Sequence, residues 1–147
     1  MERIEAARSY IQQGYSILPV LPGDKRPAVE WKQYQERLPT DAEIVVWLTK
    51  WPTANIGIIT GRISGITVVD VDGAIGLSSI NAQPIKPPAT RVVKTPKGWH
   101  LYYQYREDWH TGAGFLPGID LRNDGGYVVA PPSVVNGTEY RVFRDVP

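Results

Sequence analysis

Two segments of the chain carry apolar residues at the three- and four-residue spacing of an amphipathic helix. The first covers residues 2–13 and is followed by Gly14, which predicts that the helix ends at this glycine. The second begins at Thr40, where Glu43 completes a capping-box pattern, and ends before Pro52. The apolar positions that these helices would bury are Ile4, Ala7, Tyr10 and Ile11, and then Ile44, Trp47 and Leu48.

Short apolar runs between turn-forming residues predict the strands of the protein. The expected strands are residues 15–20, 55–60, 66–72, 90–95, 99–106, 118–122, 125–132 and 138–143. A tight turn at Pro96-Lys97-Gly98 would join two of them into a hairpin. Residues 21–35 are expected to form a loop with a helical turn, residues 73–89 a short helix and a loop, and residues 107–118 a loop. Helices come early and strands late, which is typical of an α+β fold.

Composition and charge narrow the possible settings of the protein. The 147 residues suffice for one domain with its own hydrophobic core. The net charge of +1 excludes a whole-molecule basic field as the main attraction for nucleic acid, although a local basic face is compatible with it. Cysteine is absent, which excludes disulfides and favours an intracellular setting. The N-terminus has no continuous apolar run of signal or membrane type, so no membrane partner is expected.

Three of the predicted strands carry polar, chemically reactive side chains on one face only. Because side chains alternate along a strand, Asp70 and Asp72 share one face, and Asp120 shares a face with Arg122. His100 lies on the polar face of a third strand, whose other face is apolar. If the three strands belong to one sheet, these five side chains would meet on one surface.

Carboxylates that lie close together raise one another's pKa unless a cation neutralises them. Mg²⁺ and Mn²⁺ prefer oxygen ligands and commonly bind carboxylates together with substrate phosphates. Two such ions, about 3.5–4 Å apart, can bind the attacking and leaving oxygens of a phosphoryl transfer. The pattern therefore suggests that Asp70, Asp72 and Asp120 hold two divalent ions, while His100 and Arg122 face the phosphates of a substrate.

Each of these motifs alone has a simpler explanation. An Asp-x-Asp pair at a strand end is often a turn or a solvated edge, a single histidine is often packed in a core, and a single arginine is often a surface charge. His110 is expected to be a loop residue without a function. Residues 112–118 miss the G-x-G-x-x-G pattern by one position, and no G-x-x-x-x-G-K-[ST] occurs, which excludes Rossmann and P-loop nucleotide sites.

Three stretches, taken in order, resemble the motifs of the archaeo-eukaryotic primase superfamily. They are SGITVVDVDG, KTPKGWHLYY and GIDLRNDGGYVVAPPS. They are most similar to the bifunctional primase-polymerase (prim-pol) domains of plasmids, phages and mobile elements. The family's D-h-D, small-x-His and hydrophobe-Asp patterns match Asp70 with Asp72, His100 and Asp120, which the resemblance makes the catalytic residues. The flanking KRPAVEWKQYQ and NIGIITG are also similar, so the resemblance covers nearly the whole chain.

The resemblance implies a single prim-pol catalytic domain spanning residues 1–147. An N-terminal mixed α/β part, approximately residues 1–60, would pack against an RRM-like antiparallel sheet in residues 61–147. It implies template-directed nucleotidyl transfer that uses Mg²⁺ or Mn²⁺, NTP or dNTP substrates and a single-stranded DNA template. Relatives often continue into a helical priming domain or a helicase, so the chain is expected to be part of a longer replication protein. The zinc site of some relatives needs cysteine, so no zinc is expected.

Five further residues are weaker candidates. The turn before the histidine motif is tighter than in many relatives, which leaves both Lys97 and the Gly98 amide as possible contacts of the triphosphate. Ser133 would bind a phosphate or form a turn. Lys25 and Arg26 lie in a loop, where they would contact the template or the triphosphate, or remain solvated.

Other functions would use some of the same residues. A metal-dependent nuclease would use the same carboxylates but would degrade DNA without nucleotides. A non-catalytic nucleic-acid or nucleotide-binding module would keep the fold, although four intact motif residues argue against loss of activity. A replication-initiator nicking enzyme needs a closely spaced histidine pair, and the chain has only His100 and His110.

Overall fold

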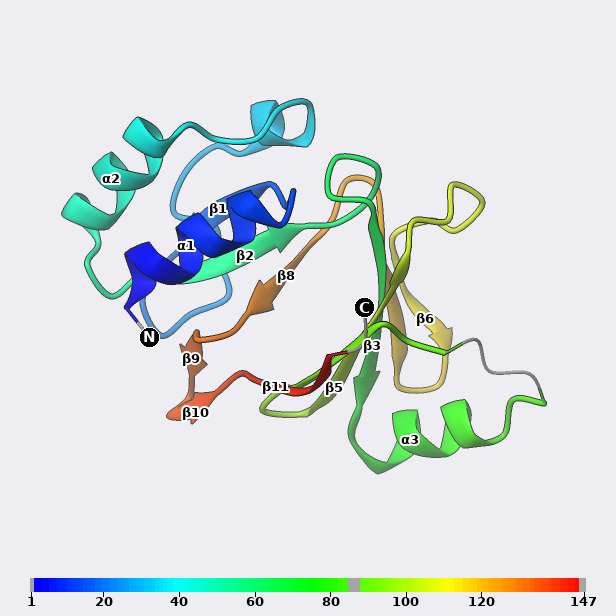
Figure 1. The fold of residues 1–147 in the computed structure, drawn as a ribbon. Helices are drawn as coiled ribbons and strands as arrows, with labels where there is room; N and C mark the ends of the chain where they lie inside the picture. The colour runs from blue at the N-terminus through cyan, green and yellow to red at the C-terminus, as the bar shows by residue number, and fades with distance from the viewer. Residues whose placement is uncertain (1, 85–87, 146–147) are drawn as a thin grey trace.

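The computed structural model describes residues 2–84 and 88–145, which form three antiparallel sheets (Figure 1). One is a short two-stranded sheet, and the other two sheets share one hydrophobic core. Of these two, the smaller sheet has the strand order β1-β2-β8, and two helices pack against it. None of the described helices is long and apolar enough to span a membrane. The elements of this part are α1 (Arg3–Gln12), β1 (Ile17–Val20), α2 (Asp41–Lys50), β2 (Asn55–Ile59) and β8 (Tyr127–Ala130).

The larger sheet has six antiparallel strands in the order β11-β4-β5-β3-β7-β6. Its central strand is β3, with β5 on one side and β7 on the other. Helix α3 follows β3 directly and packs against it. The elements are β3 (Ile66–Asp72), α3 (Gly73–Asn81), β4 (Arg91–Lys94), β5 (Gly98–Gln104), β6 (Gly112–Leu116), β7 (Ile119–Arg122) and β11 (Arg141–Asp145).

The predicted α+β class and the helices are confirmed. The Thr40 hydroxyl accepts a hydrogen bond from the Glu43 amide, and the Glu43 carboxylate accepts one from the Thr40 amide, so the capping box is complete. The expected helical turn is a 3₁₀ helix at Lys32–Gln35. The hairpin around Pro96-Lys97-Gly98 is present as β4 and β5.

Two strand predictions differ from the structure. The loop expected at residues 107–118 contains β6, which is exposed from Gly112 to Phe115 and pairs with β7. Within β6 only the last residue, Leu116, is partly buried, so the strand shows no apolar alternation and its backbone pairing leaves no signal in the sequence. The strand expected at residues 138–143 is divided at the buried Tyr140 into β10 (Thr138–Glu139) and β11, and β10 pairs with β9 (Val134–Val135).

Strand β8 returns the chain to the smaller sheet after most of the larger sheet has formed. It pairs with β2, with Ile56 opposite Ala130 and Ile58 opposite Val128. A division of the chain near residue 60 therefore does not separate the strands of the two sheets. The apolar run of β8 predicts a strand, but nothing in it specifies a partner some seventy residues away.

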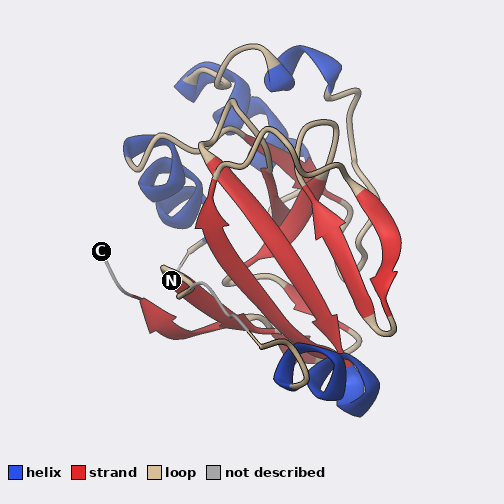
Figure 2. Ribbon diagram, turned by 90° about the vertical axis from the view of Figure 1, so that its right-hand side faces the viewer, coloured by secondary structure: helices blue, strands red, loops and turns tan. Residues whose placement is uncertain are grey.

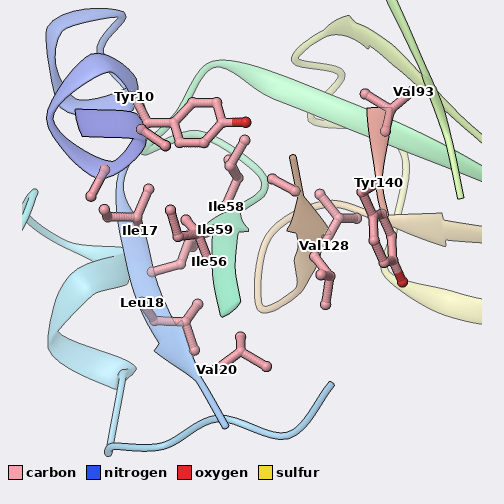
Figure 3. Close-up of a cluster of buried hydrophobic side chains, with 14 of the residues drawn as sticks. Tyr10, Ile17, Leu18, Val20, Ile56, Ile58, Ile59, Val93, Val128 and Tyr140 are labelled. Atoms are coloured by element: carbon pink, nitrogen blue, oxygen red, sulfur yellow. The ribbon is translucent and has the colours of Figure 1, made fainter. Parts of the chain in front are cut away.

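Alternation along the central strand supplies apolar side chains to both faces of the larger sheet. Val68 and its neighbour Tyr102 join the core between the two sheets, part of which is drawn in Figure 3. Val69 and Val71 join a second core on the opposite face. Because both faces of β3 are buried at these positions, the two aspartates at its end are held on a strand fixed from both sides.

The core between the sheets contains one hydroxyl group without a hydrogen-bond partner. Tyr102 is 1 % exposed, and its hydroxyl has no partner among the described residues. Burial raises the pKa of Tyr102 well above its ordinary value, so the hydroxyl remains protonated. A buried polar group without a partner costs about 1–3 kcal/mol.

We therefore expect Tyr102→Phe to leave the free energy of unfolding unchanged or to raise it by up to about 1 kcal/mol. Tyr10→Phe is the matched control, because the Tyr10 hydroxyl donates to the Pro131 carbonyl, and we expect it to lower stability by about 1 kcal/mol. Urea unfolding of both variants measures the difference. Equal losses in the two variants would contradict the account.

Candidate active site

The register of the larger sheet places the predicted site residues side by side. Asp70 on β3 is directly opposite His100 on β5 and directly opposite Asp120 on β7. Side chains at directly opposite positions of antiparallel strands lie on the same face, with Cβ atoms about 4.5–5.5 Å apart. The expectation that the three strands belong to one sheet is therefore confirmed, and Asp70 lies in the middle of a row of three polar side chains.

A third carboxylate lies on the same face at the end of β3. Asp72 is two residues beyond Asp70 and immediately precedes α3. One oxygen from each of Asp70, Asp72 and Asp120 lies within 4.8 Å of the others. The three carboxylates therefore form one cluster that could hold a metal ion.

Asp120 is held by contacts from its own strand and from β6. Its Oδ1 accepts a hydrogen bond from the Gly114 amide at 2.9 Å, and its Oδ2 lies 3.6 Å from a guanidinium nitrogen of Arg122. Strand β6, which the sequence does not predict, thus helps to orient one of the three carboxylates. Arg122 pairs in register with Val68, which is two residues before Asp70 on the same face of β3. The positive charge of Arg122 therefore lies beside the cluster.

The carboxylates have different electrostatic environments. Burial opposes the ionisation of Asp70, but its contact with His100 and the charge of Arg122 outweigh burial and lower its pKa. Burial, and then the negative charge of Asp70, raises the pKa of Asp72. Asp70 is therefore the more strongly ionised member of the pair, and Asp72 is the one that gains most from a neighbouring cation.

His100 is enclosed by the core and by the cluster. It is 6 % exposed, and its Nε2 lies 3.5 Å from Oδ1 of Asp70. Its Nδ1 has no hydrogen-bond partner among the described residues. The ring of Tyr140 lies alongside, with ring centroids 6.0 Å apart. The imidazole therefore has one nitrogen directed at the central carboxylate and one without a protein partner.

A cavity of about 310 Å³ opens beside these groups, between the two sheets. Asp70, His100 and Arg122 line it from the larger sheet, and Val128 and Val129 line it from β8. Lys25 adds a positive charge from the loop after β1. The cavity is therefore lined by negatively charged, positively charged and apolar side chains.

A family profile described as bifunctional DNA primase/polymerase, N-terminal, matches residues 7–147. The chain belongs to the prim-pol family. All the residues of the carboxylate cluster lie within the matched region. A comparison with curated protein sequences found no match. Membership in the prim-pol family implies that this domain binds DNA and nucleotides. It agrees with the resemblance of the three sequence motifs to this family.

The structure distinguishes Lys25 from Arg26, the two candidate residues in the loop after β1. Lys25 lines the cavity, and its charge favours ionisation of Asp72. Arg26 does not line the cavity; its side chain is 76 % exposed and forms an ion pair with Asp24 at 2.7 Å. The two neighbouring residues therefore have different surroundings, which the sequence alone does not distinguish.

Of the remaining candidates, Gly98 and Ser133 form hydrogen bonds within the protein, and Lys97 is exposed. The Gly98 amide donates to Oγ1 of Thr95 at 3.0 Å, and the fully buried Ser133 hydroxyl accepts from the Ile56 amide at 2.9 Å. Both groups are therefore used for turn formation and packing in this structure. Lys97 is exposed on the turn, and its carbonyl accepts from the Gly73 amide, which places it next to the end of β3.

Three aromatic residues of the prim-pol cavity were not identified from the sequence. Trp31 and Tyr127 meet edge to face with centroids 5.2 Å apart, and Tyr140 lies beside His100. Burial, followed by the negative charges of Asp70 and Asp72, raises the pKa of Tyr140 to about 12. The three residues come from separate segments of the chain, and an isolated aromatic residue predicts a core position rather than a cavity wall.

Proposed function

We propose that this domain catalyses template-directed nucleotidyl transfer, extending or beginning a DNA-paired strand from nucleoside triphosphates. The observation that carries the proposal is the convergence of three carboxylates, a histidine and an arginine beside one cavity. A nucleoside triphosphate needs cationic groups for its phosphates and a polar site at the reacting phosphorus, and both lie within this space.

The donor set fits a hard divalent cation. Asp70, Asp72 and Asp120 offer only carboxylate oxygens, which are the ligands that Mg²⁺ and Mn²⁺ prefer. The raised pKa of Asp72 reflects burial and repulsion from Asp70, a cost that a bound cation would remove. When two such ions are bound, they would supply charge stabilisation at the attacking and leaving oxygens.

In the proposed transfer, the 3′-hydroxyl of the growing strand loses its proton to solvent, and its oxygen bonds to the α-phosphorus of the nucleotide. The bond from that phosphorus to the bridging oxygen breaks, and pyrophosphate leaves. Arg122 holds the triphosphate, because a guanidinium binds phosphate oxygens in pairs and its contact with Asp120, at 3.6 Å, leaves its donors available. Lys25 adds a second charge from the opposite wall, and the exposed Lys97 is placed for a third contact.

His100 has a different part in the proposed reaction. Its Nε2 faces Asp70 and restrains that carboxylate, while the rest of the ring is packed against Tyr140. Nδ1 is buried, so Nε2 is the nitrogen that this restrained ring can offer to a phosphate oxygen as well as to Asp70, without loss of side-chain entropy on binding. The aromatic pair of Trp31 and Tyr127 supplies a flat wall for the sugar or base.

We expect Arg122→Ala to lower kcat/KM for the incoming nucleotide by about 10- to 100-fold, because charge-assisted hydrogen bonds to the triphosphate are lost. His100→Ala should act in the same direction. Nucleotide titration at fixed primer–template measures the effect. Arg26→Ala is the matched control, since Arg26 is paired with Asp24 and does not line the cavity, and it should leave KM unchanged.

A labelled primer annealed to a longer template, incubated with dNTPs and Mn²⁺, tests the proposed function itself. Primer lengthening that requires dNTPs supports it. Primer shortening that is independent of dNTPs would assign the carboxylates to a nuclease. If Arg122→Ala weakened DNA affinity without changing nucleotide KM, Arg122 would be a template contact instead.

A further inference from the structure

The outer face of the larger sheet points away from the cavity. Its central residues are buried in the second core, whereas its edge at β11 carries exposed side chains. Helix α3 lies over one end, and the strands beyond it carry no covering helix in the described part of the chain (Figure 2). Trp99 and Leu101 of β5 point to this face, because they alternate with His100. A molecule bound here would be separated from the cavity by the thickness of the sheet.

Three cationic side chains lie on this face across the edge strands. The register pairs Arg141 of β11 with Lys94 of β4, and Lys94 with Trp99 of β5. Two of the cations, Arg141 and Lys94, therefore lie in one row with Trp99. Arg144 pairs with Val92 and lies in the next row on the same face. The charges therefore follow the edge of the sheet rather than scatter over the surface.

Two aromatic rings lie among these charges. A register irregularity in β11 turns Phe143 to the outer face, where its ring meets Trp99 edge to face with centroids 5.0 Å apart. Phe143 is 69 % exposed. The ammonium group of Lys94 lies 4.7 Å from the centre of the Trp99 ring. We call the set of Lys94, Trp99, Arg141, Phe143 and Arg144 the outer platform.

The charges of the outer platform are not neutralised within the fold. None of its three cations forms a salt bridge with any residue that the structure describes, and Asp145 of the same strand pairs with Arg91 on the other face. Three cations and a largely exposed phenyl ring in one place are unfavourable for an isolated domain. A ligand that offers both negative charge and flat apolar surfaces would offset both costs.

We infer that the outer platform binds single-stranded nucleic acid, with a base on the exposed ring of Phe143 and phosphates beside the three cations. Base–aromatic stacking is worth about 1–3 kcal/mol per base and needs bases that are not paired, which favours a single strand over a duplex. Lys and Arg side chains position the backbone through phosphate contacts. The inference concerns binding alone and does not depend on the reaction proposed for the cavity.

Fluorescence anisotropy with a short labelled oligothymidylate tests the stacking contact. We expect Phe143→Ala to weaken binding by about 5- to 100-fold. The matched control is Phe115→Ala: Phe115 is 59 % exposed on β6, at the opposite edge of the sheet. Phe115 stacks on Trp109, and the guanidinium of Arg106 lies over the Trp109 ring. Arg106 is paired with Asp108, so the control should bind as the wild type does.

The salt dependence tests the phosphate contacts. Replacing Lys94, Arg141 and Arg144 with Gln should reduce the slope of log K against log salt by about 2, since each phosphate contact to a single strand contributes about 0.7. These side chains are partly or fully exposed, so the variant should fold, and its Tm checks this. An unchanged slope in a folded variant would overturn the inference.

Photo-crosslinking locates the bound strand. An oligonucleotide carrying 5-iodouracil should crosslink to the peptides that contain Trp99 and Phe143. Crosslinks confined to the cavity residues Trp31 and Tyr127 would overturn the inference. It would also be overturned if the wild type were a dimer and Phe143→Ala a monomer with unchanged DNA affinity, because the platform would then bind a second copy of the chain. Primer extension by Phe143→Ala at saturating template should keep its kcat, which separates failure of the platform from failure of the proposed reaction.

Discussion

Asp72→Asn should abolish nucleotide incorporation while leaving the fold intact. The amide has the shape of the carboxylate but not its charge, so the packing of β3 against its neighbours is preserved. Loss of one ligand from the cluster removes charge stabilisation worth several kcal/mol, which corresponds to a fall in kcat of at least about 10³-fold. Asp70→Asn and Asp120→Asn should cause losses of the same order, because one oxygen from each lies in the same cluster.

The effect on stability distinguishes a metal site from an ordinary acidic cluster. Burial and the charge of Asp70 raise the pKa of Asp72, so removing its charge should leave the metal-free Tm unchanged or slightly higher. Mn²⁺ should raise the Tm of the wild type but not that of Asp72→Asn. Asp108→Asn is the matched control, because Asp108 is exposed and lies outside the cluster. Near-normal incorporation by Asp72→Asn would contradict the metal assignment.

Gly98→Ala should disrupt the fold at the active site. A Cβ atom at Gly98 would lie 1.9 Å from the carbonyl oxygen of Val71 and 3.2 Å from the Gly73 amide nitrogen. These are backbone atoms, which cannot move without separating β5 from β3 at the position where Gly98 faces Asp72. We expect a loss of about 3 kcal/mol or more, the upper end of overpacking effects, together with loss of activity.

The chain supplies a matched control for this prediction. Gly112 lies on β6, and a Cβ atom there would meet nothing within 4 Å. Gly112→Ala should therefore unfold at nearly the wild-type urea concentration, while Gly98→Ala should unfold at a much lower one or fail to accumulate as soluble protein. Equal stability of the two variants would show that β3 and β5 tolerate wider separation than their packing indicates.

The sequence predicted most of the residues that meet at the candidate site, because the relevant signals are local. Alternation along one strand is enough to show that Asp70 and Asp72 share a face and that Val69 and Val71 take the other. The order in which strands pair is not local, so convergence of these residues was an inference from their chemistry. The register that places Asp70 between His100 and Asp120 gives that inference its geometric basis.

The parts that the sequence did not predict depend on contacts between distant segments. Strand β6 is exposed except at Leu116, and its role in holding Asp120 comes from the single amide of Gly114. Tyr140 lines the cavity and directly precedes β11, the strand that pairs with β4. Conversely, Ser133 and Gly98 have polar groups that suggest a ligand, whereas packing and turn formation account for both.

Template-directed selection of the nucleotide is the central claim, and single-nucleotide incorporation tests it most directly. One labelled primer is annealed to four templates that differ only in the first unpaired base, and each dNTP is supplied alone with Mn²⁺. We predict that the wild-type domain adds the complementary nucleotide on each template, and that Asp120→Asn adds none. Addition of the same nucleotide on all four templates, or shortening of the primer, would contradict the account.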